Sequence, residues 1–267
     1  MQRFTLLFIC SLLFSNCFAQ LDLSSSQWQE DLRFLQKTVH EDYPFLFKKI
    51  TKEDFDAKVE KLYNSIPSLQ EHQIVTGFAK IVASFEYGHT VLSMRGSAFQ
   101  YHQLPWNLYD FNDGIFVEGV HKDYENVLGA KVLEVEGMPV KKALEAVRPV
   151  VPAENDQFVK AYGFSYFGIP EILHTKGVIK ELKNDIVVTF EKEGKTFRET
   201  ITAVPVQRMP TEYGFMKNEG DWLSSRNQSE RPLYLKHLDK IYYYEYLPDE
   251  KTVYVRHSQI QDDPSED

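Results

Sequence analysis

Cysteine is almost absent from this sequence. It has 267 residues and two cysteines, Cys10 and Cys17, and both lie within the first twenty positions. The rest of the sequence therefore has no thiol for a disulfide, for a zinc–thiolate site or for a cysteine nucleophile.

Long apolar runs and an excess of positive charge are missing as well. No segment reaches the ~20 apolar residues that a membrane-spanning helix needs, so no integral membrane span is expected. Lys and Arg number 30 against 39 Asp and Glu, a net charge of −9, and no basic stripe stands out, so nucleic acid is not an expected partner. An apolar content of 43% is that of a folded protein and excludes a disordered chain.

The common signatures of cofactor-binding and hydrolytic sites are also missing. There is no P-loop, no H-E-x-x-H, no G-x-G-x-x-G and no G-x-S-x-G elbow, and no cofactor or metal is expected. In the segment 163–168, Ser165 is followed by one residue too many for an elbow, so it is interpreted as an ordinary loop or helix residue. The cluster His40–Glu41–Asp42 is interpreted as the polar end of a helix.

Residues 1–19 have the pattern of a secretory signal peptide. Arg3 precedes a short apolar run, and Cys17 and Ala19 put small residues at the −3 and −1 positions of a cleavage site. Lipidation at Cys17 is the less favoured alternative, because Asn16 is a poor residue before a lipidated cysteine. The protein is therefore expected to be exported, to a periplasmic or extracellular location.

Residues 26–85 predict three amphipathic helices. Apolar residues recur at spacings of three and four up to Pro44 and again between Thr51 and Pro67, and a third such stripe stops at Gly88. Because the connections are short, the helices should pack as a small helical unit.

Capping residues predict where these helices begin. A capping side chain satisfies backbone N–H groups that have no partner inside the helix. Thr51 is expected to cap the second helix, and two pairs have the spacing of a capping box: Ser26 with Gln29, and Ser68 with Glu71.

From residue 90 onward the pattern changes to short strands. A helix is expected at 140–147, partly helical structure at 153–180, and loop with short pieces of structure at 204–240. Strands are predicted at 90–94, 114–120 and 131–135, and in two hairpins, 185–191 with 196–203 and 241–246 with 252–257.

The segment Glu86–Thr90 lies where the third predicted helix ends and a strand is expected. Gly88 permits a left-handed turn there, which would aim the next side chain away from the helix. An imidazole held on such a corner suits a general base, because its pKa lies near neutrality. His89 is therefore the candidate catalytic residue, and the alternative is a histidine that only hydrogen-bonds a loop.

The order of these segments resembles the N-terminal region of the tail-specific, or C-terminal-processing, serine peptidases, especially their tricorn-core-like branch. That family usually has Gly-Asp-Gly-His-Thr where this sequence has Glu86–Thr90, so the last three residues match and the first two do not. Residues 128–140 are similar to a segment of PDZ domains, with Ala130 in place of the usual aspartate.

The resemblance implies an α+β fold with three parts. They are an N-terminal three-helix unit, a PDZ-like β-rich domain with a helical insertion, and the first hairpin of an incomplete α/β (ClpP/crotonase-like) catalytic domain. After the leader at 1–19, the implied limits are 20–90 for the helical unit, 91–205 for the PDZ-like domain with its insertion at 153–180, and 206–267 for the linker and the start of the catalytic domain.

The resemblance also implies a function, peptide hydrolysis through a serine that a histidine activates. Only His89 matches a catalytic position, and the serine is expected beyond residue 267, so this chain alone is expected to be inactive toward its peptide or unfolded-protein substrate. An alternative is a non-catalytic exported protein that binds peptide in a groove between 114–120 and 140–147. A third hypothesis is another hydrolase, using Glu86 and His89 as a carboxylate–histidine pair. The oligomeric state and the peptide-contacting residues are not predicted.

Overall fold

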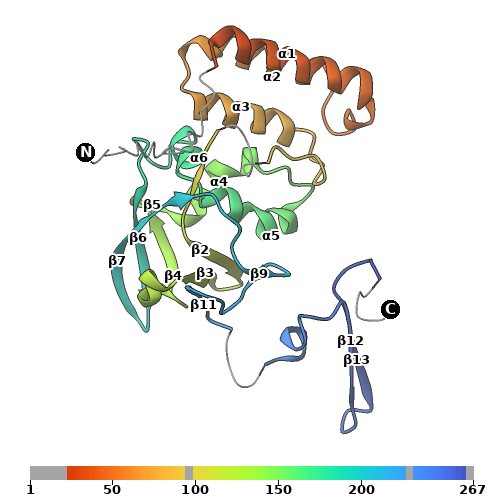
Figure 1. Cartoon of the computed structure of the whole chain (residues 1–267), viewed down its shortest axis with the longest axis vertical. Helices are drawn as coiled ribbons and strands as arrows, with labels where there is room; N and C mark the ends of the chain where they lie inside the picture. The colour runs from red at the N-terminus through yellow and green to blue at the C-terminus, as the bar shows by residue number, and fades with distance from the viewer. Residues whose placement is uncertain (1–22, 94–98, 227–230, 263–267) are drawn as a thin grey trace, which may run out of the picture.

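The computed structural model describes residues 23–93, 99–226 and 231–262. The predicted leader at 1–19 and Met94, the last residue of the strand predicted at 90–94, lie outside these ranges. The described chain is a mixed α+β structure of helices and antiparallel sheets, in agreement with the predicted class (Figure 1). The division into domains stays a prediction.

The helices form two groups. α1 to α3 make an outer layer, and α4 to α6 lie between this layer and the main sheet (Figure 1). In the described part of the chain, no helix is both long and apolar enough to cross a membrane. The α-helices are α1 (Ser25–Asp42), α2 (Lys52–Ser65), α3 (Glu71–Ala83), α4 (Val140–Val147), α5 (Asp156–Phe167) and α6 (Pro170–Thr175). Short 3₁₀ turns are η1 (Pro44–Leu46), η2 (Ile66–Ser68), η3 (Lys122–Val127), η4 (Arg148–Val150) and η5 (Leu233–Leu235).

The predicted cap of α1 is wrong by two residues. Ser24 rather than Ser26 precedes the helix, and Gln27 rather than Gln29 accepts the Ser24 backbone N–H at 2.9 Å. Serines occupy positions 24 to 26, so the capping-box spacing alone allowed more than one register. Thr51 is confirmed as the cap of α2, where its hydroxyl accepts a backbone N–H of the first turn at 3.1 Å.

The predicted capping box of α3 is also wrong. Ser68 lies inside η2, next to Pro67, and does not cap the helix. Gln70 is the N-cap, and the Gln73 side chain accepts its backbone N–H at 3.0 Å. Glu71 is therefore the first residue of α3 and not the third, since the 3₁₀ turn delays the start of the helix.

One main antiparallel sheet carries most of the strands. Its order is β11–β3–β4–β6–β7, with β2 paired to β3 and β5 paired to β4. Small separate pairs are formed by β1 with β8, β9 with β10 and β12 with β13. The strands are β1 (His102–Gln103), β2 (Trp106–Phe111), β3 (Gly114–His121), β4 (Lys131–Val135), β5 (Met138–Pro139), β6 (Asp185–Lys192), β7 (Lys195–Thr202), β8 (Val204–Pro205), β9 (Thr211–Glu212), β10 (Phe215–Met216), β11 (Trp222–Ser224), β12 (Tyr242–Leu247) and β13 (Thr252–His257).

Most of the predicted strands are confirmed, and the helix predicted at 140–147 is α4. The strand predicted at 90–94 is wrong over residues 90–93, because the structure has no strand there. The strand that pairs with β3 is instead β2, which the sequence pattern did not indicate. Its outer half, Tyr109–Phe111, exposes aromatic side chains, so its alternation between buried and exposed positions is weak.

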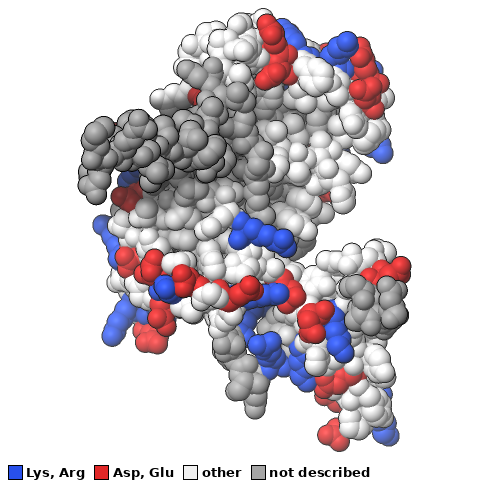
Figure 2. All heavy atoms as spheres, viewed as in Figure 1, with Lys and Arg blue, Asp and Glu red and all other residues white. Residues whose placement is uncertain are grey.

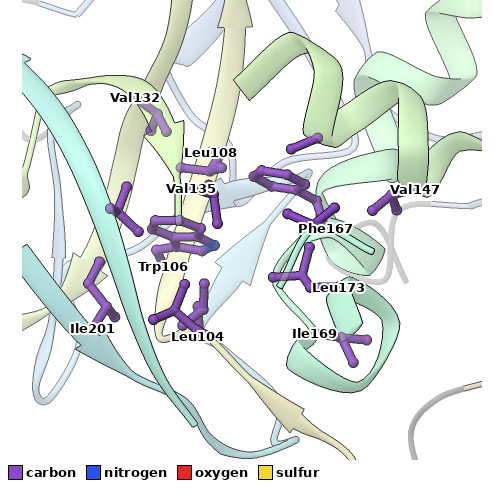
Figure 3. Packing of buried hydrophobic residues seen from close by; sticks show 14 of the residues in the cluster. Leu104, Trp106, Leu108, Val132, Val135, Val147, Phe167, Ile169, Leu173 and Ile201 are labelled. Atoms are coloured by element: carbon purple, nitrogen blue, oxygen red, sulfur yellow. The ribbon is translucent and has the colours of Figure 1, made fainter. Parts of the chain in front are cut away.

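Two hydrophobic clusters hold these layers together. The larger one fills the space between the sheet and helices α4 to α6, where the Trp106 and Phe167 rings lie parallel with centroids 6.5 Å apart (Figure 3). The smaller one lies among α1, α2 and α3. Helix α3 contributes to both, with Val75 and Ala79 in the larger cluster and Ile74 and Ile81 in the smaller one. Since both faces of α3 are buried, the helical layer is packed onto the rest of the molecule through it.

The β12–β13 hairpin projects from this body (Figure 1). Arg256 of β13 fastens it to the preceding segment by donating to the backbone carbonyls of Tyr234 and Lys240, at 3.3 and 3.2 Å. On the face drawn in Figure 2, acidic and basic side chains are interspersed over the lower part of the molecule.

Candidate functional site

The candidate residue His89 lies in a tight turn after α3. The helix ends at Ala83 and not at Gly88 as predicted, and Phe85 after it is buried against Phe55. Glu86 takes the left-handed conformation, with φ of 48°. The predicted left-handed Gly88 is therefore wrong: the chain reverses two residues earlier, where Phe85 enters the core.

Gly88 is needed for packing rather than for its backbone angle. A side chain at this position would place its Cβ 2.3 Å from the ring of Phe158 on α5. The Gly88 backbone N–H donates to the carboxylate of Glu154 at 3.0 Å. A backbone hydrogen bond from Thr90 N–H to the Tyr87 carbonyl, 2.9 Å long, closes the turn. The start of the predicted insertion thus braces the turn that carries His89.

The His89 side chain is exposed at the surface of this turn. Its ring lies 5.9 Å from that of Tyr87, which in turn meets Phe45 edge-on at 6.2 Å. A cavity of about 360 Å³ next to it is lined by Phe45, Tyr87, Glu86 and Glu154 among others. No hydrogen bond joins the imidazole to another residue of the described ranges.

Among the described residues, no hydrogen bond joins a serine to the His89 imidazole. Ser165, the one serine near a glycine motif, is on α5 and donates its hydroxyl to the Tyr162 carbonyl at 2.7 Å. Its interpretation as a helix residue is confirmed. Among the residues described, Glu86 and His89 share no hydrogen bond or ion pair, so the carboxylate–histidine hypothesis has no supporting contact.

The other predicted polar cluster is the end of α1. His40 is in its last turn and contacts Asp56 of α2, with Nε2 2.8 Å from Oδ1. Within 23–93, 99–226 and 231–262, no group of three or more His, Cys, Asp or Glu side chains is placed to hold a metal ion. The contact of His40 with Asp56 therefore links α1 to α2.

Two networks of buried polar side chains were not identified from the sequence. The first is Glu118 on β3, whose carboxylate accepts hydrogen bonds from Asn107 Nδ2, the Met216 backbone N–H, the Ser224 hydroxyl and Arg226 Nε, at 2.6 to 3.1 Å. This side chain is 1% exposed. A lone glutamate in the apolar run 114–120 was the available signal, since buried carboxylates require partners.

The second is a pair of histidines between α3 and α6. His72 Nε2 lies 2.8 Å from His174 Nδ1, and His72 is 3% exposed. Burial, with the neighbouring His174 adding to it, lowers the pKa of His72 to about 4. Glu171, three residues before His174 on α6 and also buried, has its carboxylate 2.7 Å from His102 Nδ1. The two histidines of the first pair are 102 residues apart, so no local pattern could have joined them.

The groove predicted beside residues 114–120 is not open along β3. Strand β2 pairs with β3 over residues 106–111, and β11 and β4 pair with its other edge. A peptide strand needs an edge with unpaired backbone groups. Strand addition at β3 would therefore have to displace one of its present neighbours.

Comparison with known proteins gives a structural likeness but no match to a family. No protein-family model matches this sequence, and no curated protein matches it significantly. A crystal structure of a serine-to-alanine mutant of CPAF matches with a TM-score of 0.52 and 13% sequence identity. The match covers 68% of this chain and 34% of the CPAF chain, so this chain spans about a third of the protein it resembles. At this identity the likeness supports a fold similar to that part of CPAF, and nothing finer.

Proposed function

We propose that this chain is the histidine-bearing and PDZ-like portion of an exported, tail-specific serine endopeptidase. Its substrate would be a peptide or an unfolded protein, and its serine nucleophile would lie outside these 267 residues. The observation that carries the proposal is His89, an exposed imidazole on a braced turn, in a fold similar to that of CPAF, a tail-specific-protease-like serine protease.

The chemistry assigned to His89 is that of a general base. It would take the proton of the serine hydroxyl as that oxygen attacks the peptide carbonyl, and would then pass it to the leaving amine. The turn supports this role, because the Glu154 hydrogen bond and the Phe158 ring hold the backbone at Gly88, the residue before His89. Residues 20–267 alone would not turn over peptides, since no hydrogen bond joins a described serine to the imidazole.

The test begins with the genomic DNA downstream of the codon for Asp267. Where the reading frame continues, the extended protein should degrade an unstructured protein, and His89→Ala should lower kcat/KM by roughly 10²- to 10⁴-fold, as loss of a general base does. His40→Ala is the matched control, because that histidine only links α1 to α2, and should leave kcat/KM nearly unchanged. Turnover that survives His89→Ala, or serine-dependent cleavage by residues 20–267 alone, would contradict the proposal.

A second candidate is an exported peptide-binding protein without catalysis. It is favoured by the lack of a described serine near His89 and by the segment from β4 to α4, which has the strand–turn–helix order of a PDZ domain. Titration of residues 20–267 with peptides that have free C-termini tests it. No binding at millimolar peptide would exclude this use of the domain.

A further inference from the structure

A basic cavity lies between the helical layer and the segment 148–155. Its volume is about 730 Å³. Residues from α2, α3 and η4 line it, and the cationic ones are Lys49, Lys58, Lys61, Lys80 and Arg148. Three acidic residues share the lining, so positive charge predominates in a chain whose net charge is −9.

Within the described residues, the four lysines of this cavity have no acidic partner. In the described ranges none of the four forms an ion pair, whereas Arg148 pairs with Asp156 at 2.6 Å. Asp54 lies one turn before Lys58 on α2 and lines the same cavity, yet the two are not within ion-pair distance. Ammonium groups gathered around one cavity repel each other and attract an anionic ligand.

Charges on α2 are divided between its two sides. Asp56 and Glu60 pair with α1, the first with His40 at 2.8 Å and the second with Arg33 at 3.0 Å. The two lysines of α2 that line the cavity lie at other positions of the helix surface. Two acidic groups of α2 are thus paired with α1, whereas Asp54 lines the cavity together with Lys58 and Lys61.

The basic cavity continues toward His89. It shares four lining residues with the smaller cavity next to the candidate site: Lys49, Glu86, Glu154 and Asn155. Tyr87 lines that smaller cavity, and its ring contacts the ring of His89. A ligand that occupies both cavities would therefore extend from the lysines to the candidate catalytic histidine.

We propose that the basic cavity binds an acidic segment of the peptide substrate, with Lys58, Lys61 and Lys80 contacting its carboxylates. This inference rests on the proposed function and adds a substrate class to it, peptides with acidic residues a short distance from the position that reaches His89. Exposed lysines reach carboxylates singly and weakly, so several such contacts would act together.

The test is a binding measurement that does not depend on hydrolysis. A fluorescently labelled, end-capped peptide of six glutamates is titrated with residues 20–267 at low salt, followed by anisotropy. The triple variant Lys58→Gln, Lys61→Gln, Lys80→Gln should weaken binding by about tenfold, because three exposed ion pairs are lost. The matched control Lys141→Gln, Lys142→Gln, Lys195→Gln removes the same charge from exposed positions outside the cavity and should change affinity far less.

Salt and sequence controls complete the test. Binding should fall steeply as salt approaches 1 M, where charges are screened over about 3 Å. Equal weakening by the two triple variants, or equal binding of a six-glutamine peptide, would overturn the inference. So would duplex DNA bound more tightly than the peptide through the same three lysines. Because His89 is unchanged in these proteins, the inference can fail while the proposed function stands, and the reverse.

Discussion

Two β-hairpins of this molecule, β6–β7 and β12–β13, both alternate in sequence as strands do, but one is buried on one face and the other is exposed on both strands. In β6–β7, the inward residues Ile186, Val188, Phe190 and Ile201 are all fully buried. In β12–β13, the residues of one face are all exposed, and Tyr244 keeps 76% of its surface. The register puts Tyr244 opposite Val255, so the face is continuous across both strands.

The difference lies in what covers each hairpin. The first is joined to β4 at one edge, and its buried side chains belong to the larger cluster between the sheet and α4 to α6 (Figure 3). The second pairs with no other strand in the described part of the chain. Alternation of apolar residues predicts a strand equally well in both cases, but burial requires a second layer, which alternation does not report.

The largest loss of stability is expected when a buried side chain of the β6–β7 hairpin is truncated. Phe190→Ala removes a fully buried ring that lies 5.7 Å from that of Phe197, and should lower the free energy of unfolding by roughly 3–5 kcal/mol. Urea denaturation followed by circular dichroism measures it. A loss below 1 kcal/mol would mean that the body does not rely on this layer.

Glu118→Ala tests the connection that precedes the exposed hairpin. The carboxylate holds Ser224, Arg226 and the Met216 backbone against β3. Its removal leaves Arg226 with its charge unpaired and should cost roughly 3 kcal/mol, near the lower end for breaking a buried pair. Glu125→Ala, an exposed change in the neighbouring η3, should cost under about 0.5 kcal/mol. Equal losses in the same denaturation assay would show that the network does not stabilise the fold.

The stability of the contact between α3 and α6 should depend on pH. His72 has a pKa lowered to about 4, against about 6.5 in the unfolded chain, so the unfolded chain binds more protons between these values. Stability is therefore fully present above pH 6.5 and is lost as the pH falls toward 4, by at most about 1.4 kcal/mol per pH unit. His72→Gln should remove that slope in urea titrations across this range. Parallel curves for both proteins would refute it.

The sequence predicted the elements of this fold better than their partners. Periodicity located α2, α4 and both hairpins, because these depend on local alternation and on turn residues such as Gly194, whose φ is 72°. Periodicity did not locate β2, because this strand is defined by its pairing with β3 and not by an alternation in its own sequence. The capping boxes failed for a similar reason: several Ser and Gln residues had the right spacing, and tertiary packing chose among them.

The candidate site was predicted only as a single residue. The sequence indicated a turn at Gly88–His89, because the apolar helical pattern ends there. The contacts that hold this turn, from Glu154 and Phe158, come from a segment 65 or more positions away. The Glu118 and His72 networks likewise join residues about 100 positions apart. Side-chain chemistry can nominate such residues, whereas only the fold identifies their partners.

The smallest effect is expected at the exposed hairpin. Tyr244→Ser replaces a ring that is mostly in solvent. Its neighbours on that face, Tyr242 on the same strand and Val255 on the opposite strand, are exposed as well. Little apolar surface is lost from the folded state, so the free energy of unfolding should change by less than about 0.5 kcal/mol. Urea denaturation in parallel with Phe190→Ala makes the comparison direct. A loss above 2 kcal/mol, rising with protein concentration, would show that another surface covers this face in solution.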